Sequence, residues 1–386
     1  MKYFLTEDCV LKWLENPSVY HLGHDDLYEL DDLSFAFLRK CASDGGCSAE
    51  QTEFIRYCLH EGILTKDRLT TMKHPALIKS PVPSLRYLEL QITDRCNLRC
   101  RHCYIGDTKV SVRRGKYRKK ELTITQIKKI LKEFEEMQGL RVLVSGGEPL
   151  IHSRFGMIND MLPGFSVRKV LFTNGLLLTR ATLETLHVDE IQVSIDGLQH
   201  AHDSLRGQGS YKAALKAVYM ALDSGFEVSV STMVHPGNLN DFDSLETLFK
   251  KIGIRDWTVD VPCVTGRLKE HGQFEISPEE GGKYLGYGFG EGLHSGSSGF
   301  GCGLHLMAVM ADGNAAKCTF YAESPVGNIQ DGLRKCWQRI PPVRLADLKC
   351  DCGHLELCRG GCRYRAALLG DPYGRDLYKC KMYDIM

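Results

Sequence analysis

Asp94-Arg95-Cys96-Asn97-Leu98-Arg99-Cys100-Arg101-His102-Cys103-Tyr104 is the segment that decides the fold, and it directly follows an apolar, strand-like run. The spacing of Cys96, Cys100 and Cys103 supplies three thiolates to a cubane iron–sulfur cluster and leaves one iron without a protein ligand. Such an iron can chelate a small molecule and pass an electron into it. The alternatives are a zinc site, which usually needs paired cysteines or histidines at set spacings, and scattered core cysteines. The spacing favours the cluster.

Three further polar motifs stand where apolar runs end. They are Gly146-Gly147-Glu148-Pro149, Phe172-Thr173-Asn174-Gly175 and Gln192-Val193-Ser194-Ile195-Asp196-Gly197. Glycines let a backbone approach a ligand closely, and a carboxylate can pair with an ammonium group. Each motif alone is equally typical of an ordinary turn. Together they fall where a parallel barrel places its ligand-binding groups.

The strands of that barrel are predicted from apolar runs, and amphipathic helices are predicted between them. The runs are 85–92, 140–144, 169–172, 190–195, 227–234 and 256–261. One helix would begin with Thr125 as N-cap, present Ile127, Ile130, Leu131, Phe134 and Met137, and stop at Gly139; another would cover 211–224 and stop at Gly225. This alternation predicts a parallel α/β barrel or sheet, with chemistry at the carboxyl ends of the strands.

Together the motifs resemble the radical S-adenosylmethionine (radical SAM) superfamily, whose signature has the same cysteine spacing and an aromatic residue before the third cysteine. The resemblance implies a partial six-stranded (β/α)6 barrel over residues 85–280, a catalytic [4Fe-4S] cluster, and a 5′-deoxyadenosyl radical derived from S-adenosylmethionine. A ferredoxin- or flavodoxin-type protein would supply the electrons. The implied ligands of the catalytic cluster are Cys96, Cys100 and Cys103, and the implied cofactor contacts are His102 at the adenine, Gly146, Gly147 and Glu148 at the methionyl amine, and Asn174, Ser194 and Asp196 elsewhere.

Eight of the sixteen cysteines follow Gly301. Residues 311–314 are expected to form a hairpin turn between two of them, giving C-x10-G-x4-C, and C-x5-C-x3-C comes later. This resembles the SPASM domain, which binds two auxiliary four-iron clusters; residues 300–386 would form it. The resemblance implies Cys302, Cys318 and Cys362 for the first cluster and Cys352, Cys358 and Cys380 for the second, joined by Cys350. Cys350 departs from the family spacing. Three possibilities remain for the fourth site of the first cluster: Cys336, Cys263, or an iron left open to substrate. A disulfide framework or zinc ribbons are the alternatives for this tail.

Residues 1–75 precede the barrel. Short strands are expected at 20–22, 27–30 and 63–64, with one helix from Asp31 or Asp32 and a second opened by a capping box at 48–51 and ending at Gly62. The pattern resembles a winged-helix α+β module, and in peptide-modifying radical SAM enzymes such modules capture a leader peptide at a sheet edge. A purely structural extension is the equal alternative.

Composition agrees with several modules in one chain. The 386 residues carry a net charge of +1, which does not point to nucleic acid. No stretch is long enough to span a membrane, and the acidic start does not suit a signal peptide, so a reducing cytoplasm is expected. The segment 109–120 holds seven basic residues, either as a solvated loop or as a lid for an acidic peptide or electron donor. The Gly/Ser-rich stretch 281–303 is predicted to link barrel and tail.

The favoured function is oxidative modification of a side chain in a ribosomally made peptide or protein. One alternative is maturation of a small cofactor, such as a tetrapyrrole or a metal-cofactor precursor. The other is a non-catalytic iron–sulfur electron carrier, which the Gly-Gly-Glu segment argues against because a carrier has no need to bind a methionyl amine.

Overall fold

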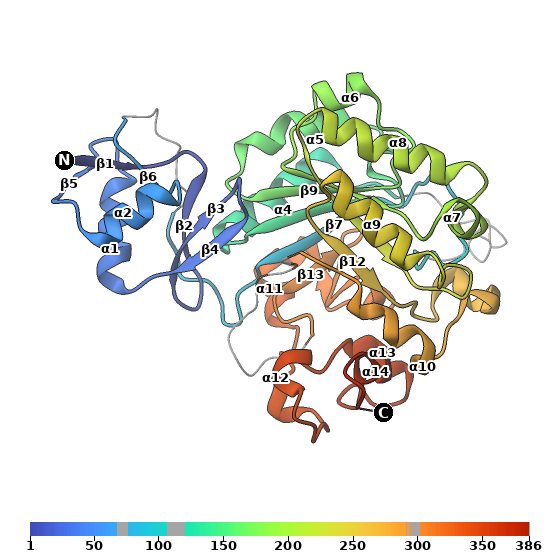
Figure 1. Cartoon of the computed structure of the whole chain (residues 1–386). Helices are drawn as coiled ribbons and strands as arrows, with labels where there is room; N and C mark the ends of the chain where they lie inside the picture. The colour runs from blue at the N-terminus through green and yellow to red at the C-terminus, as the bar shows by residue number, and fades with distance from the viewer. Residues whose placement is uncertain (68–75, 106–119, 291, 293, 295–301, 386) are drawn as a thin grey trace.

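Six consecutive parallel strands form the core of the protein (Figure 1). The computed structural model describes residues 1–67, 76–105, 120–290, 292, 294 and 302–385. The strands are β7 (Tyr87–Thr93), β8 (Arg141–Gly146), β9 (Arg168–Thr173), β10 (Glu190–Ser194), β11 (Glu227–Met233) and β12 (Trp257–Asp260), adjacent in chain order. Their apolar residues are buried on both faces, as expected for parallel strands covered by helices. The six predicted strands are confirmed.

Helices connect these strands and cover the sheet. They are α4 (Ile124–Glu136), α5 (Phe155–Met161), α6 (Arg180–Glu184), α7 (Gln199–Arg206), α8 (Ser210–Asp223) and α9 (Phe242–Ile252). Helix α4 buries the predicted apolar stripe, but its N-cap is Thr123 and not Thr125. The Thr123 hydroxyl accepts from the Gln126 N–H while the Gln126 side chain accepts from the Thr123 N–H, and this reciprocal capping box fixes the start.

The end of α4 also differs from the prediction. Gln138, and not Gly139, takes the left-handed conformation, with φ of 68°. Gly139 is needed for space, because a Cβ there would lie 2.3 Å from the Phe134 ring. The glycine therefore allows close packing and does not itself stop the helix.

The sheet continues beyond the six predicted strands. Strand β13 (Leu306–Val309) pairs in parallel with β7, and β14 (Asn314–Ala316) and β15 (Gly327–Asn328) extend the sheet antiparallel. The predicted hairpin turn at 311–314 is confirmed, with Gly313 in a positive-φ conformation. The first part of the cysteine-rich tail is thus built into the same sheet as the barrel strands.

The remaining helices are short: α10 (Pro278–Gly281), α11 (Leu333–Gln338), α12 (Leu355–Cys358), α13 (Arg363–Leu368) and α14 (Leu377–Met382). Figure 1 shows α12, α13 and α14 below the barrel, whereas α11 packs against α4. The beginning of the predicted linker is not a free linker, because a Cβ on Gly282 would lie 2.6 Å from the Tyr378 carbonyl oxygen and from the Lys381 Cβ. Residues 278–286 therefore pack on α14.

The N-terminal module contains strands β1 (Lys2–Leu5), β2 (Cys9–Trp13), β3 (Pro17–His21), β4 (Asp26–Glu29), β5 (Cys47–Ser48) and β6 (Leu64–Thr65), with helices α1 (Asp32–Cys41) and α2 (Glu53–His60). They form two three-stranded antiparallel sheets, β5-β1-β6 and β2-β3-β4. Ser48 lies in a strand, so the expected capping box at 48–51 is wrong. Thr52 caps α2, because its hydroxyl accepts from the Ile55 N–H. The winged-helix resemblance stays a prediction.

The module docks on the barrel through the turn between β3 and β4. Asp25 Oδ1 accepts from Arg141 Nε at 2.8 Å, and Asp25 Oδ2 lies 3.5 Å from Arg168 Nε. Arg168 also pairs with Glu190 at 3.2 Å and with Glu227. Arg141, Arg168, Glu190 and Glu227 are the first residues of β8, β9, β10 and β11. The module therefore closes the amino-terminal end of the barrel.

A buried lysine strengthens this interface. Lys12 Nζ donates to the Gly139 carbonyl at 2.7 Å and to the Ser166 carbonyl at 3.0 Å. Burial lowers the pKa of Lys12 to about 7.

Two sequence features remain to be placed. Residues 109–119 of the basic segment lie outside the described residues, and Lys120 pairs with Asp312 at 3.0 Å. Among the described helices, none combines the length and apolar character needed to cross a membrane.

Candidate active site

A cavity of about 330 Å³ opens where the parallel strands end. Its walls come from the cysteine loop after β7 and from the carboxyl ends of β8 to β12, the position at which parallel α/β folds place their chemistry. Nine of the residues predicted from the sequence line it: Cys96, Cys100, His102, Cys103, Gly146, Gly147, Asn174, Ser194 and Asp196.

The two glycines hold the cysteine loop in place. The Gly147 N–H donates to the Thr93 carbonyl at 2.9 Å, and the Glu148 N–H donates to the Arg95 carbonyl at 2.8 Å. A Cβ on Gly146 would lie 2.3 Å from the Thr93 oxygen, and one on Gly147 would lie 2.3 Å from the Arg95 oxygen. Only glycine permits this backbone contact.

Glu148 is fully buried and is not among the residues that line the cavity. Its carboxylate accepts from the Thr173 hydroxyl at 2.8 Å and from the Asn174 N–H at 2.9 Å. Burial raises the pKa of Glu148 to about 7. The side chain thus ties the end of β9 to the end of β8, and it carries a buried charge with no cation beside it in the described part of the chain.

Asn174 extends this set of contacts to the cysteine loop. Its Nδ2 donates to Asn97 Oδ1 at 2.8 Å and lies 4.0 Å from Cys96 Sγ. Arg267 holds the other side of the loop, since its Nε donates to the Cys100 carbonyl at 2.8 Å and its N–H to the Cys103 carbonyl at 3.0 Å. The three thiols are therefore carried on a loop fixed from both sides.

Asp196 has its carboxylate occupied by the protein. Its Oδ1 accepts from the Met233 N–H at 2.8 Å, and its Oδ2 accepts from Arg206 Nε at 2.5 Å. Burial opposes ionisation, but the charge of Arg206 holds the pKa of Asp196 well below its usual range. Asp196 therefore orients Arg206, a cavity residue that the sequence did not single out and that could pair with a carboxylate.

His102 lies partly buried beside this pair, with Nε2 4.0 Å from Asp196 Oδ2. Burial and the nearby Arg206 lower the pKa of His102 to about 3, so the ring is neutral. Its Nδ1 is buried without a hydrogen-bond partner among the described residues.

Glu89 was also missed by the sequence reasoning, because it sits inside an apolar strand with no motif around it. It lines the cavity and accepts from Ser145 Oγ at 3.1 Å and from the Tyr104 hydroxyl at 3.3 Å. Burial raises the pKa of Glu89. The alternation of β7 side chains could have indicated that it faces the barrel interior.

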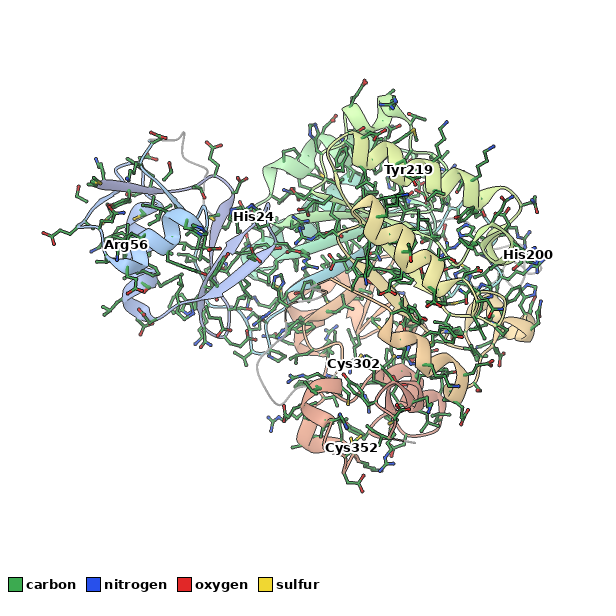
Figure 2. All side chains as sticks on the ribbon, viewed as in Figure 1. His24, Arg56, His200, Tyr219, Cys302 and Cys352 are labelled. Atoms are coloured by element: carbon green, nitrogen blue, oxygen red, sulfur yellow. The ribbon has the colours of Figure 1, made fainter. Side chains whose placement is uncertain are left out.

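The cysteines that follow the barrel strands gather in two groups. In the first, hydrogen bonds from the thiols of Cys263 and Cys302 lower the pKa of Cys362, and Cys318 lies within electrostatic range of both Cys302 and Cys362. In the second, burial and the nearby thiols of Cys352 and Cys358 raise the pKa of Cys350, and burial and the thiols of Cys350 and Cys352 raise the pKa of Cys380. Figure 2 shows Cys302 just beneath the barrel and Cys352 farther out in the tail. Cys336 joins neither group.

These arrangements fit iron–sulfur clusters better than single metal ions. No three metal-ligating side chains in the described ranges come close enough to hold one ion. A cubane cluster spreads its irons over several corners and needs more widely spaced thiols. The three loop thiols, the free His102 nitrogen and the glycine-lined wall leave room for a cluster and a small cofactor in one cavity.

Comparison with known proteins agrees with this geometry, because residues 90–250 match the radical SAM superfamily. The chain belongs to the radical SAM superfamily. This radical SAM enzyme binds a [4Fe-4S] cluster and S-adenosylmethionine, as members of the superfamily do.

Two relatives show how far the similarity extends. The radical SAM enzyme is 27% identical to mycofactocin maturase MftC of Mycolicibacterium smegmatis over 326 residues, 74% of this chain and 80% of that protein. It is 32% identical to an AdoMet-dependent heme synthase of Methanosarcina barkeri over 200 residues, 50% of this chain and 55% of that protein.

Solved structures share the fold over a longer range. Streptococcus suis SuiB bound to S-adenosylmethionine superposes with a TM-score of 0.67 at 15% identity, covering 97% of this chain and 99% of that chain. The anSMEcpe structure with bound AdoMet gives 0.59 at 17% identity, covering 77% of this chain and 94% of that one. The match to SuiB includes the N-terminal module and the cysteine-rich tail.

Proposed function

We propose that this radical SAM enzyme is a peptide maturase, which oxidatively modifies a side chain of a ribosomally made peptide. The observation that carries the proposal is the fold shared with SuiB over 97% of the chain, N-terminal module included. SuiB has been crystallised with its precursor peptide SuiA. The similarity to a maturase over 326 residues supports the same reading.

The roles of the barrel residues form part of this proposal. Cys96, Cys100 and Cys103 hold the catalytic cluster, and Gly146, Gly147 and Glu148 bind the methionyl amine. His102 lies beside the adenine, and Asn174, Ser194 and Asp196 contact the rest of the cofactor, with Asp196 acting through Arg206. When bound, the catalytic cluster and S-adenosylmethionine supply a 5′-deoxyadenosyl radical that takes a hydrogen atom from the substrate.

The protein's own contribution is positioning and exclusion of water. The hydrogen bonds from Gly147 and Glu148 to the carbonyls before Cys96 fix the thiol loop, and the salt bridge from Asp196 aims Arg206 into the cavity. The buried Glu148 carboxylate carries an uncompensated charge that an ammonium group would neutralise.

The tail would hold two auxiliary clusters. Cys302, Cys318 and Cys362 bind the first, and Cys350, Cys352, Cys358 and Cys380 bind the second. The grouping of Cys350 with the other three thiols supports its inclusion despite its unusual spacing. Residues 1–75, 85–280 and 300–386 then act as recognition module, radical barrel and auxiliary-cluster domain, with a ferredoxin- or flavodoxin-type donor in the cytoplasm.

Peptide capture would use the edge of β4 next to α2. Tyr28 on β4 and Tyr57 on α2 meet edge to face, with ring centroids 6.3 Å apart, and the Tyr28 hydroxyl donates to Glu61 at 3.1 Å. Among the described strands, β4 pairs with β3 alone, so its other edge can accept an added strand. Tyr57 is 49% exposed and offers an aromatic surface beside that edge.

The small-cofactor alternative rests on the heme synthase relatives. Their similarity spans 50% of this chain for the Methanosarcina barkeri protein, against 74% for the maturase. The similarity to the heme synthases therefore supports a shared barrel and does not account for the N-terminal module.

The experiment supplies the reconstituted enzyme with S-adenosylmethionine, a strong reductant and synthetic peptides encoded by short reading frames beside its gene. We expect a mass decrease in one peptide, matched by formation of 5′-deoxyadenosine. A tetrapyrrole precursor serves as the competing substrate, and its conversion with no peptide modified would reject the proposal.

Point variants then test the capture site, because deleting the module would expose the charges that it buries. Tyr57→Ala should raise the peptide KM several-fold and leave peptide-free 5′-deoxyadenosine formation unchanged. Leu33→Ala is the matched control, since Leu33 is 85% exposed and lies at the start of α1, not on β4 or α2. Equal KM values for both variants would exclude this edge.

A further inference from the structure

Cys263 follows directly after strand β12 and lies outside the cysteine-rich tail, yet its thiol meets the tail cysteines. It is buried and forms a hydrogen bond with Cys362, which in turn is hydrogen-bonded to Cys302. Cys318 completes the group. Four thiols therefore converge from three separate segments: the end of a barrel strand, the two flanks of the β13–β14 hairpin, and the residue before α13.

Buried ion pairs hold these segments together. Arg365 Nη1 donates to Asp260 on β12 at 2.7 Å, and Arg365 Nη2 donates to Asp376 at 2.8 Å. The Cys362 N–H donates to the same Asp376 carboxylate at 2.7 Å. Arg365 thus clamps the end of β12, and Cys263 with it, against the turn that carries Cys362.

The charges around the group suit a buried cluster. A four-iron cluster with four thiolates carries net negative charge, and buried charges need compensation. Lys317 lies within electrostatic range of Cys302, Cys318 and Cys362, and Arg363 Nε is buried with no hydrogen-bond partner among the described residues. The sulfur atoms of a bound cluster would accept a hydrogen bond from this free Arg363 N–H.

Cys336, the other cysteine considered for this site, has a structural environment. It is fully buried in the apolar core between sheet and helices, and its thiol donates to the Asn328 carbonyl at 3.4 Å. The charged groups that face it are Arg339, Asp331 and Glu133, with no thiol among them.

We propose that Cys263 is the fourth ligand of the first auxiliary cluster, which closes that cluster to substrate and makes it the acceptor for the electron leaving the substrate. Cys263 also lines the cavity that holds Cys96, Cys100 and Cys103, so the cluster borders the place where the substrate reacts. This role for the cluster rests on the proposed function, in which the electron comes from a peptide substrate.

The substrate oxidation balances in electrons and protons when the first auxiliary cluster accepts one electron. The substrate gives one hydrogen atom to the 5′-deoxyadenosyl radical and forms 5′-deoxyadenosine. The remaining substrate radical gives one electron to the oxidised auxiliary cluster and one proton to solvent, a net two-electron oxidation. A one-electron carrier protein of the ferredoxin or flavodoxin class then reoxidises the cluster.

The test uses full-length enzyme in which Cys96, Cys100 and Cys103 are all alanine, so that only auxiliary clusters contribute to the spectra. Cys263→Ala, Cys263→Ser and the control Cys336→Ala are compared anaerobically by iron content and by electron paramagnetic resonance of the reduced protein. No peptide is needed, so failure of the peptide proposal would leave this result standing.

We expect Cys263→Ala to change the spectrum of one cluster and to lower iron from about eight per chain to about seven or four, as one iron or one cluster is lost. Cys263→Ser should retain the iron with a shifted reduction potential, because oxygen replaces sulfur as ligand. Cys336→Ala should leave iron and spectrum as they are. Unchanged iron, spectrum and potential in both Cys263 variants would overturn the proposal.

Added 2-mercaptoethanol provides a second measurement. In the parent protein a closed cluster should not respond to the thiol, whereas a cluster opened by Cys263→Ala should bind it and change its spectrum. A response of the first auxiliary cluster in the parent protein would show an open iron and reject the assignment.

Discussion

The two ends of the barrel strands are built in opposite ways. At the amino-terminal end, Asp25 meets Arg141 and Arg168, and the buried charges are paired across the interface with the N-terminal module. At the carboxyl end, the polar groups surround a cavity. Glu89 and Glu148 are buried there with hydrogen-bond donors but with no cation beside them among the described residues, and His102 Nδ1 has no hydrogen bond. His24 and His200 mark these opposite sides in Figure 2.

The amino-terminal ends of the six strands therefore serve stability, and the carboxyl ends of the same strands serve chemistry. A buried carboxylate without a cation destabilises a fold unless a ligand neutralises it, so Glu89 and Glu148 at the carboxyl end mark the binding site. Changes at the paired end should affect unfolding and spare the chemistry. Changes at the cavity end should have the reverse effect.

The largest effect is expected at the cavity end, from changing Cys96, Cys100 and Cys103 to alanine together. Formation of 5′-deoxyadenosine should cease, while iron falls by about one cluster and the two auxiliary clusters remain. Iron analysis and product chromatography measure this. Wild-type iron near four per chain would contradict the assignment of two auxiliary clusters.

At the paired end, Asp25→Ala should lower the free energy of unfolding by about 3–5 kcal/mol, because it leaves buried arginines without their counter-charge. Denaturant unfolding of the full chain measures the change. Asp26→Ala is the control, since Asp26 is only partly buried and accepts a single long hydrogen bond from Tyr28, at 3.4 Å. An equal loss in both variants would mean that the turn matters and the ion pairs do not.

Glu148→Ala sharpens the comparison with a smaller change. It should weaken S-adenosylmethionine binding by about 1.5–3 kcal/mol, because a charge-assisted hydrogen bond to the amine is lost. Since the pKa of Glu148 is raised to about 7, the wild-type affinity should also fall as the pH drops below about 7 and the carboxylate is protonated. Equilibrium binding of S-adenosylmethionine measures both effects. Glu184→Ala, on the exposed surface of α6, is the control and should change neither the affinity nor its pH dependence. Unchanged binding in Glu148→Ala would mean that Gly146-Gly147-Glu148 is only a turn.

The most gradual expected effect is the pH dependence of stability from Lys12. Its pKa is lowered to about 7 in the folded protein, so between pH 7 and about 10 the unfolded chain binds the extra proton. The free energy of unfolding should therefore rise with pH in that range, by at most about 1.4 kcal/mol per pH unit, and this stability is lost as the pH falls toward 7. Lys12→Met should remove the slope. Denaturant titrations at several pH values decide the point.

The sequence predicted the parts of the fold that depend on local pattern. The apolar runs marked all six parallel strands, and the α4 stripe marked its buried face. It did not predict that β13 pairs with β7, because residues 306 and 87 meet through a contact between distant segments. The same reason hid the docking of Asp25. In the site, motifs identified the residues of the strand ends, whereas Arg206 and Glu89 carry no motif and only the fold brings them to the cavity.

The docking of the module at the closed end sets a minimum length for any peptide captured there. Strand β7 alone spans seven residues, or about 23 Å at 3.3 Å per residue. A captured leader must therefore pass along the outside of the barrel before its reactive residue reaches the cavity at the other end. Even a fully extended chain needs at least about seven residues for that distance. The enzyme would then modify only residues that lie beyond a minimum number of positions from the bound leader, and residues close to the leader would not be modified.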